Sequence, residues 1–424
     1  MKALLLGALL APATLLAGAD HEHTEDCCEL NLWTGEGVTI GNWLLPEINY
    51  QAAAGSSTLN PARLAVGHHD PDRHGLTQQA FEVAATIRLG ERVSFFGTYS
   101  GKVDLNDHWL SEFEEYYATF DLPGGIRVRG GRMQPRLGFQ NELHVHSFDF
   151  VDQYLASARM FGEDPLVIIG GEVQMPVLRR LPKGWDDRLT VSFGAIPDAE
   201  EEDHLEFGPE PDFESDGRLF ADWAATAYYR IGYNATEATR YESGVSGAWG
   251  GNEDGRHSQV YGVHFAYLWK PEGVAHDGHH HHGAGSEFFR WKTEAFVRHF
   301  GAISGHVEEE AAHEEHEDEH EDEAAETAGV RDEFFDAGIY TTLIYGFRNG
   351  RTEARLRGEY VTGVSEAGLP ERWRISPALV WRPTSRLPIH FKLQYNFDHA
   401  PSFGTEHSVW AQFNLSWGDC CAHQ

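Results

Sequence analysis

Histidine is the residue whose number and spacing most clearly suggest chemistry in this chain. The chain has 25 histidines, and many of them stand beside aspartate or glutamate. Neutral imidazole and carboxylate together suit Zn²⁺, Cu²⁺ and Ni²⁺, and His-rich tracts bind such ions weakly. The alternative is that these clusters are solvated loops without a ligand. The candidate metal ligands are His68, His69, His144, His146, Asp149, Asp152, His279, His280, His281, His282, His313, His316 and His320.

A second group consists of charged residues that alternate with apolar ones. In the interior of a closed sheet such charges would face water and set an ion preference. Alternatively, they pair with acidic residues on neighbouring strands and hold the wall together. The residues in question are Arg127, Arg129, Arg355, Arg357, Glu359, Arg372 and Arg374.

The cysteines form two adjacent pairs, Cys27 with Cys28 and Cys420 with Cys421. Each pair lies just outside the first or the last predicted strand. In an oxidising compartment, disulfides could therefore join the two ends of the chain. The alternative is a cluster of thiols that binds a soft metal together with nearby histidines.

The scaffold that positions these residues is predicted to be a sheet of long strands. Between 407 and 417, Val409, Phe413 and Trp417 share one face with other apolar residues, and polar residues occupy the other face. A period of two of this kind fits a strand between lipid and water. The pattern recurs in about sixteen segments, with a range of about 14–18, most of them long enough to cross a bilayer when tilted. The fold class is therefore all-β, a transmembrane antiparallel β-barrel.

The connections between these segments alternate in length. Short turns are predicted at 89–92, 122–125, 232–234 and 347–350, and most of the other connections are long. Short turns are expected on the periplasmic side and long loops outside. The connection 136–164 is aromatic and long enough to fold into the lumen and narrow it, with an external packed loop as the alternative.

The predicted organisation follows from these elements. Residues 1–19 resemble a signal peptide, and 20–37 form a periplasmic segment with His and Cys. The barrel spans 38–417 and contains the long loop 136–164 and a disordered, acidic, His-rich loop at 302–331. Residues 418–424 form a C-terminal tail with Cys and His. Lipid of the outer membrane and the barrel assembly machinery are the expected partners.

Charge and motifs exclude several functions. The formal net charge of −33 argues against nucleic-acid binding and favours cations as partners. The chain has no nucleophile elbow, zinc-protease motif or phosphate loop, so we predict no enzymatic activity and no required cofactor.

Several stretches resemble a family of Gram-negative proteins described as zinc-regulated, TonB-dependent outer-membrane receptors. The matching stretches are 69–71, 76–82, 114–117, 122–125, 131–132, 141–152, 376–379, 393–396 and 407–410. The resemblance implies an outer-membrane barrel connected with zinc uptake and with an energising inner-membrane partner. The sequence departs from that pattern because it shows no plug motif, so such a partner is not expected and we interpret the chain as porin-like.

These observations predict a porin-like channel in the outer membrane of a Gram-negative bacterium. It would take up divalent metal ions by diffusion, with Zn²⁺ as the leading ion, and His144, His146, Asp149 and Asp152 would form a site near the constriction. The alternative is a general or anion-selective porin whose arginine-lined lumen admits phosphate-like solutes. A third possibility is an adhesion or scaffold barrel with a closed lumen.

Overall fold

The computed structural model describes most of the predicted barrel. The described residues are 34–35, 38–39, 44–58, 70–71, 75–90, 92–103, 109–162, 164–178, 180–197, 220–252, 256–271, 287–304, 330–348, 350–364, 369–383, 389–401 and 404–418. The predicted signal peptide and most of the loop 302–331 lie outside them. So do Cys27, Cys28, Cys420, Cys421, His68, His69, His279, His280, His281, His282, His313, His316 and His320.

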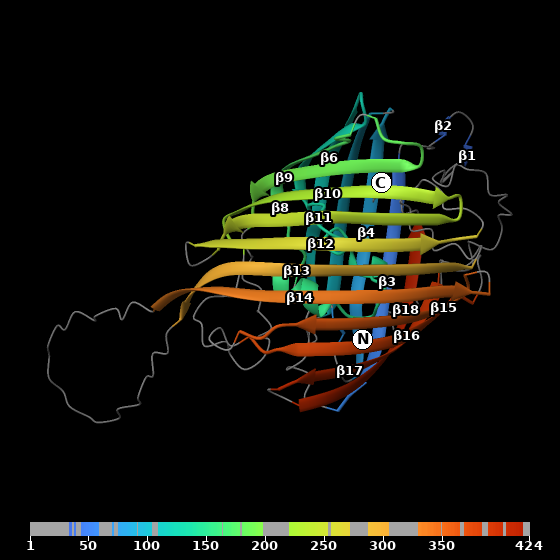
Figure 1. The fold of residues 1–424 in the computed structure, drawn as a ribbon. Coiled ribbons are helices and arrows are strands. Elements are labelled where there is room, and N and C mark those ends of the chain that lie inside the picture. Colours follow the sequence, from blue (N-terminus) through green and yellow to red (C-terminus); the bar gives the residue numbers. More distant parts are fainter. Residues whose placement is uncertain are drawn as a thin grey trace, which may run out of the picture.

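Sixteen antiparallel strands form one closed barrel (Figure 1). Each strand pairs with its neighbours in sequence, and β18 pairs with β3 to close the ring. The strands are β3 (Leu44–Ser57), β4 (Gly75–Leu89), β5 (Val93–Val103), β6 (Trp109–Leu122), β7 (Ile126–Met133), β8 (Ile168–Met175), β9 (Trp185–Ala195), β10 (Trp223–Thr236), β11 (Thr239–Gly251), β12 (His257–Trp269), β13 (Phe288–Ser304), β14 (Val330–Phe347), β15 (Thr352–Val361), β16 (Arg372–Trp381), β17 (Ile389–Ala400) and β18 (Gly404–Gly418). A separate two-stranded sheet pairs β1 (Thr34–Gly35) with β2 (Val38–Thr39). The predicted fold class and strand number are confirmed.

The two faces of the barrel wall have opposite character. The outer face carries exposed apolar side chains, such as Phe193 (62 % exposed) and Val263 (57 %). The inner face carries polar and charged side chains such as Arg374, Asn396 and Asp398, all of which are buried. A soluble protein would bury its apolar face, so this arrangement fits a barrel that contacts lipid outside and a polar lumen inside.

Short and long connections alternate over most of the barrel, but the connection from β12 to β13 is long and the one from β17 to β18 is short. Two predicted boundaries were also wrong. The turn predicted at 232–234 lies inside β10, and the chain turns only after Thr236. A Cβ atom at Gly232 would lie 2.1 Å from an Arg240 nitrogen, so the end of that side chain would have to shift. The barrel was predicted to begin at residue 38, but its first strand, β3, begins at Leu44. Its second half consists mainly of alanine, glycine and serine, whose small side chains give little alternating signal.

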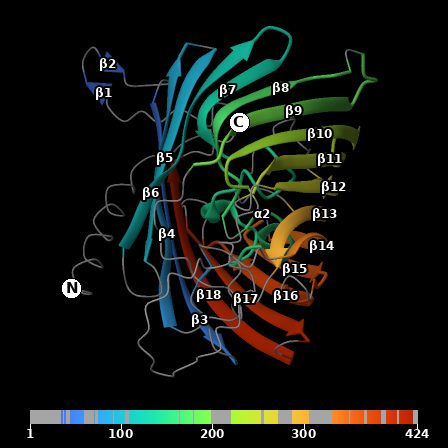
Figure 2. The same ribbon diagram turned by 90° about the vertical axis from the view of Figure 1, so that its left-hand side faces the viewer.

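The connection between β7 and β8 lies inside the barrel. It carries a short 3₁₀ helix, η3 (Val145–Ser147), and one α-helix, α2 (Leu155–Phe161). Figure 2 shows α2 enclosed by the strands, with β4 to β6 on one side and β13 to β16 on the other. Phe150, Tyr154 and Met160 of this loop form an apolar cluster with wall residues such as Phe296 and Tyr340. We call residues 134–167 the lumen loop.

Helices play a small part in the fold. Within the described residues, no helix is long and apolar enough to cross a membrane.

Candidate metal site in the lumen

The lumen loop is bound to two chemically different sides of the barrel. Its histidines contact glutamates of β3, β4 and β6, and residues 148–152 contact arginines and a lysine of β13, β15, β16 and β17. We call these sides the acidic wall and the basic wall. The inward glutamates of the acidic wall that contact the loop histidines are Glu47, Glu82, Glu114 and Glu115.

His144 lies between two glutamates of β6. Its Nδ1 is 2.6 Å from Glu114 Oε2, and its Nε2 is 2.8 Å from Glu115 Oε2. Both glutamates face inward because β6 has an irregular register with β5 at this point. Such bulges re-aim side chains.

His146 contacts the neighbouring strands in the same way. Its Nδ1 is hydrogen-bonded to Glu82 on β4, and its Nε2 is 3.3 Å from Glu47 Oε1 on β3. The imidazole rings of His144 and His146 are nearly parallel, with their centroids 5.9 Å apart. The two histidines therefore form one continuous cluster with four carboxylates.

The pKa values of both imidazoles reflect these contacts. Burial by itself lowers the pKa of His144, but Glu114 and Glu115 outweigh burial and raise it well above its ordinary value. Burial also acts to lower the pKa of His146, while Glu82 and Glu47 raise it. Without a metal, the glutamates therefore favour the protonated form of each imidazole, whose charge partly offsets theirs. A metal ion bound to these nitrogens would replace the protons, as metal binding to histidine generally does.

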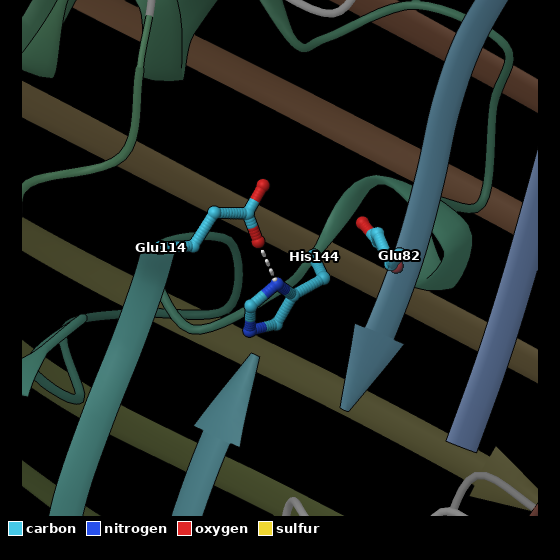
Figure 3. Close-up of side chains that lie close together, drawn as sticks. All are labelled: Glu82, Glu114 and His144. Carbon is cyan, nitrogen blue, oxygen red and sulfur yellow. Dashed lines mark hydrogen bonds and ion pairs between the residues drawn. The ribbon is translucent and has the colours of Figure 1, made fainter. Parts of the chain in front are cut away.

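The donor set fits a divalent metal ion. One ligand atom each from Glu82, Glu114 and His144 lie within 4.8 Å of one another, and all three residues are buried (Figure 3). Imidazole nitrogen and carboxylate oxygen are ligands that Zn²⁺ accepts. Among the described residues, the buried Oε1 of Glu82 has no hydrogen-bond donor. Buried oxygens are normally paired, so a cation at this position would satisfy it.

A cavity lies beside His144, on the loop side of the cluster. It has a volume of about 100 Å³ and is bordered by Asp70 in the connection between β3 and β4 and by Asp164 in the lumen loop. Glu112, Glu114 and His144 also line it. Arg132 also lines the cavity, but the four carboxylates outnumber it and favour the entry of cations.

Two of the four residues predicted for the metal site are elsewhere. Asp152 binds Arg357 and Arg374 of the basic wall at 2.6 and 2.7 Å, and Asp149 is paired with Arg290. The prediction that these aspartates join His144 and His146 is therefore wrong. The lumen loop turns between them, so that its histidines and its aspartates reach different walls.

The predicted lumen arginines all have carboxylate partners. Arg127 pairs with Asp121, Arg129 with Glu172, and Arg355 with Glu353. These contacts agree with the alternative that the arginines hold the wall together.

Three of the remaining predicted lumen charges, Arg357, Glu359 and Arg374, also contact the lumen loop. Arg357 pairs with Asp152 and Glu359, and Arg372 and Arg374 both pair with Asp398. Glu359 additionally accepts a hydrogen bond from the backbone of the lumen loop, so these charges anchor the loop as well as line the wall.

The four glutamates of the acidic wall were not among the predicted metal ligands. Glu82 was visible as a polar residue between apolar ones, and Glu114 and Glu115 belong to a stretch that carries the family resemblance. Their approach to His144 and His146 depends on how the lumen loop folds, which the spacing in the sequence does not show.

Comparisons with known proteins identify the fold. No protein-family description and no curated protein matches this chain. OmpF from Salmonella typhi, solved with daunomycin, is 9 % identical with a TM-score of 0.50, and the match covers 88 % of this chain and 97 % of that one. OprB from Pseudomonas putida, solved at high pH, is also 9 % identical with a TM-score of 0.50, covering 88 % and 94 %. An anion-selective porin from Comamonas acidovorans is 8 % identical with a TM-score of 0.49, covering 88 % and 99 %.

These likenesses show a shared fold, the sixteen-stranded barrel of the porins. Together with the apolar outer face, they support the predicted location in a Gram-negative outer membrane. The narrower resemblance to zinc-regulated, TonB-dependent receptors gains no support from them.

Proposed function

We propose that this protein is a porin-like outer-membrane channel that admits divalent metal ions, with Zn²⁺ as the leading ion. The observation that carries the proposal is the contact of His144 and His146 with four inward glutamates at the narrowed part of the lumen. The acidic cavity beside His144 supports it, because it offers cations a route to this cluster. The choice of zinc among divalent ions rests on the ligand types and on the family resemblance.

The transport we propose is passive diffusion. In the described part of the chain, the lumen is narrowed by the loop between β7 and β8, which belongs to the barrel itself. A channel of this kind needs binding that is strong enough to select an ion and weak enough to release it.

The test is ion selectivity in planar bilayers. Purified protein under a ZnCl₂ gradient should give a reversal potential on the cation side, and Glu114→Gln should move it toward zero. Asp121→Asn is the matched control, because it removes the same charge from β6 at a side chain that is 43 % exposed, paired with Arg127 and outside the cavity. An equal shift in both variants would show a general charge effect and would contradict a site at Glu114.

The basic wall favours a second candidate, an anion-selective porin. Arg290, Arg355 and Lys392 lie on β13, β15 and β17 and bind oxygens of the lumen loop. The same bilayer measurement separates the two functions. An anion-side reversal potential that zinc does not change would support the second candidate and contradict the first.

A further inference from the structure

We infer that the acidic wall holds two metal positions in series, an outer one at His144 and an inner one at His146, with Glu82 between them. This inference rests on the proposed function and adds the number and order of the bound ions. It is carried by the two separate imidazoles and by a group of buried oxygens beside the second one.

The outer position has His144 as its nitrogen ligand. Glu114 and Glu115 contact the two nitrogens of this ring, and both come from β6. His144 and Glu114 line the cavity on the loop side of the cluster, whereas His146, Glu82 and Glu47 do not. An ion that enters through this cavity therefore meets His144 first.

The inner position has His146 as its nitrogen ligand. Glu82 on β4 and Glu47 on β3 contact its ring, so its carboxylates come from other strands than those of the outer position. The side chains of His146 and Glu82 are 11 % and 2 % exposed. Because these ligands are buried, an ion bound to them would exchange hydrating water for protein ligands.

Buried oxygens beside His146 give independent support. Within the described residues, Asn49 Oδ1 and Glu82 Oε1 are buried and have no hydrogen-bond donor. Asn49 is the cross-strand partner of Glu82, and its amide nitrogen donates to Glu47 Oε1 at 2.7 Å. Amide and carboxylate oxygens of this kind are ligands for a hard or borderline divalent cation.

Glu82 connects the two positions. Its carboxylate contacts His146 and also lies within 4.8 Å of the ligand atoms of His144 and Glu114. Two divalent ions at adjacent positions repel each other, which weakens the binding of each. Repulsion between neighbouring sites is how selective channels release ions that they bind.

The experiment counts zinc ions bound to the full-length protein in detergent by equilibrium dialysis. Other His-rich segments contribute equally to every variant, so the differences between variants are the result. His144→Ala and His146→Ala should each lose one zinc per barrel, and the double variant should lose two. Glu115→Gln and Glu47→Gln, which change only the wall, should weaken the outer and the inner position respectively.

The outcomes separate the inference from the proposed function. If His144→Ala loses one zinc and His146→Ala loses none, a single site exists and the series is overturned, while the channel function stands. If no variant changes the count, the acidic wall binds no zinc and both proposals fail. Heat-dependent gel mobility of each variant verifies that the barrel has folded.

Discussion

Asp152 and Arg374 are 222 residues apart in the sequence, yet their carboxylate and guanidinium groups lie 2.7 Å apart in the lumen. The same carboxylate accepts hydrogen bonds from Arg357, Gln394 and Asn396 at 2.6 to 2.7 Å. Both partners are essentially inaccessible to solvent. This contact fixes the second half of the lumen loop to β15, β16 and β17, while the histidines of its first half meet the acidic wall.

Replacing Asp152 with asparagine should loosen the lumen loop. The change leaves Arg357 and Arg374 with one carboxylate fewer in a buried setting, and breaking a buried pair costs about 3–5 kcal/mol. We expect a lower free energy of unfolding and a larger, noisier single-channel conductance. The matched control is Asp121→Asn, because Asp121 is 43 % exposed and pairs with Arg127. Its loss should cost at most about 1 kcal/mol. Equal effects of the two variants would contradict an anchoring role.

The contribution of Asp152 to stability should depend on pH in one direction. Burial acts to raise the pKa of Asp152, but Arg357 and Arg374 outweigh it and hold this pKa far below its ordinary value. A group whose pKa is lowered on folding stabilises the protein fully above its unfolded pKa, about 3.9, and loses that contribution as the pH falls toward the folded pKa. The stability difference between the wild-type protein and Asp152→Asn should therefore be constant from pH 7 to about 5 and shrink below about pH 4. Urea titrations in detergent at several pH values measure it, and a difference that shrinks near pH 6 would refute this assignment.

Gly138 should be required where the lumen loop passes Glu294. Its φ is +66°, and a Cβ atom there would lie 2.1 Å from Glu294 Oε1. That carboxylate accepts hydrogen bonds from Tyr340 and from the Phe139 backbone, so it cannot move without breaking them. Gly138→Ala should lower the midpoint of thermal unfolding clearly more than Gly90→Ala. Gly90 has a similar φ of +70° and open space around it, so its variant measures the backbone strain alone.

The outer face should tolerate charge only near its rim. Val263 is the central residue of β12 and is 57 % exposed on the lipid side. Val263→Arg should destabilise the barrel in lipid vesicles by about 2–4 kcal/mol, because arginine is costly at the midplane of a bilayer. Thr405→Arg, near the loop end of β18, should cost about 0–1 kcal/mol. Urea titration of vesicle-inserted protein measures both, and equal costs would argue against a lipid band at Val263.

The sequence by itself determined the wall of the barrel. A strand places alternate side chains on opposite faces, so Val409, Phe413 and Trp417 could be assigned to lipid without knowing their neighbours. Strand number and connection lengths followed from the same local pattern. Where side chains are small, as in the second half of β3, the pattern is weak, and there the prediction placed the strand six residues too early.

Only the tertiary structure decided the candidate site. Asp152 lies six residues after His146 and was therefore grouped with it, but the lumen loop has no repeating period that fixes where its side chains point. Its path is set by contacts with Glu82, Arg357 and Arg374, which come from strands far apart in the sequence. Contacts between residues so far apart in the sequence depend on the closed barrel. Closure places the acidic and basic walls on opposite sides of the same loop.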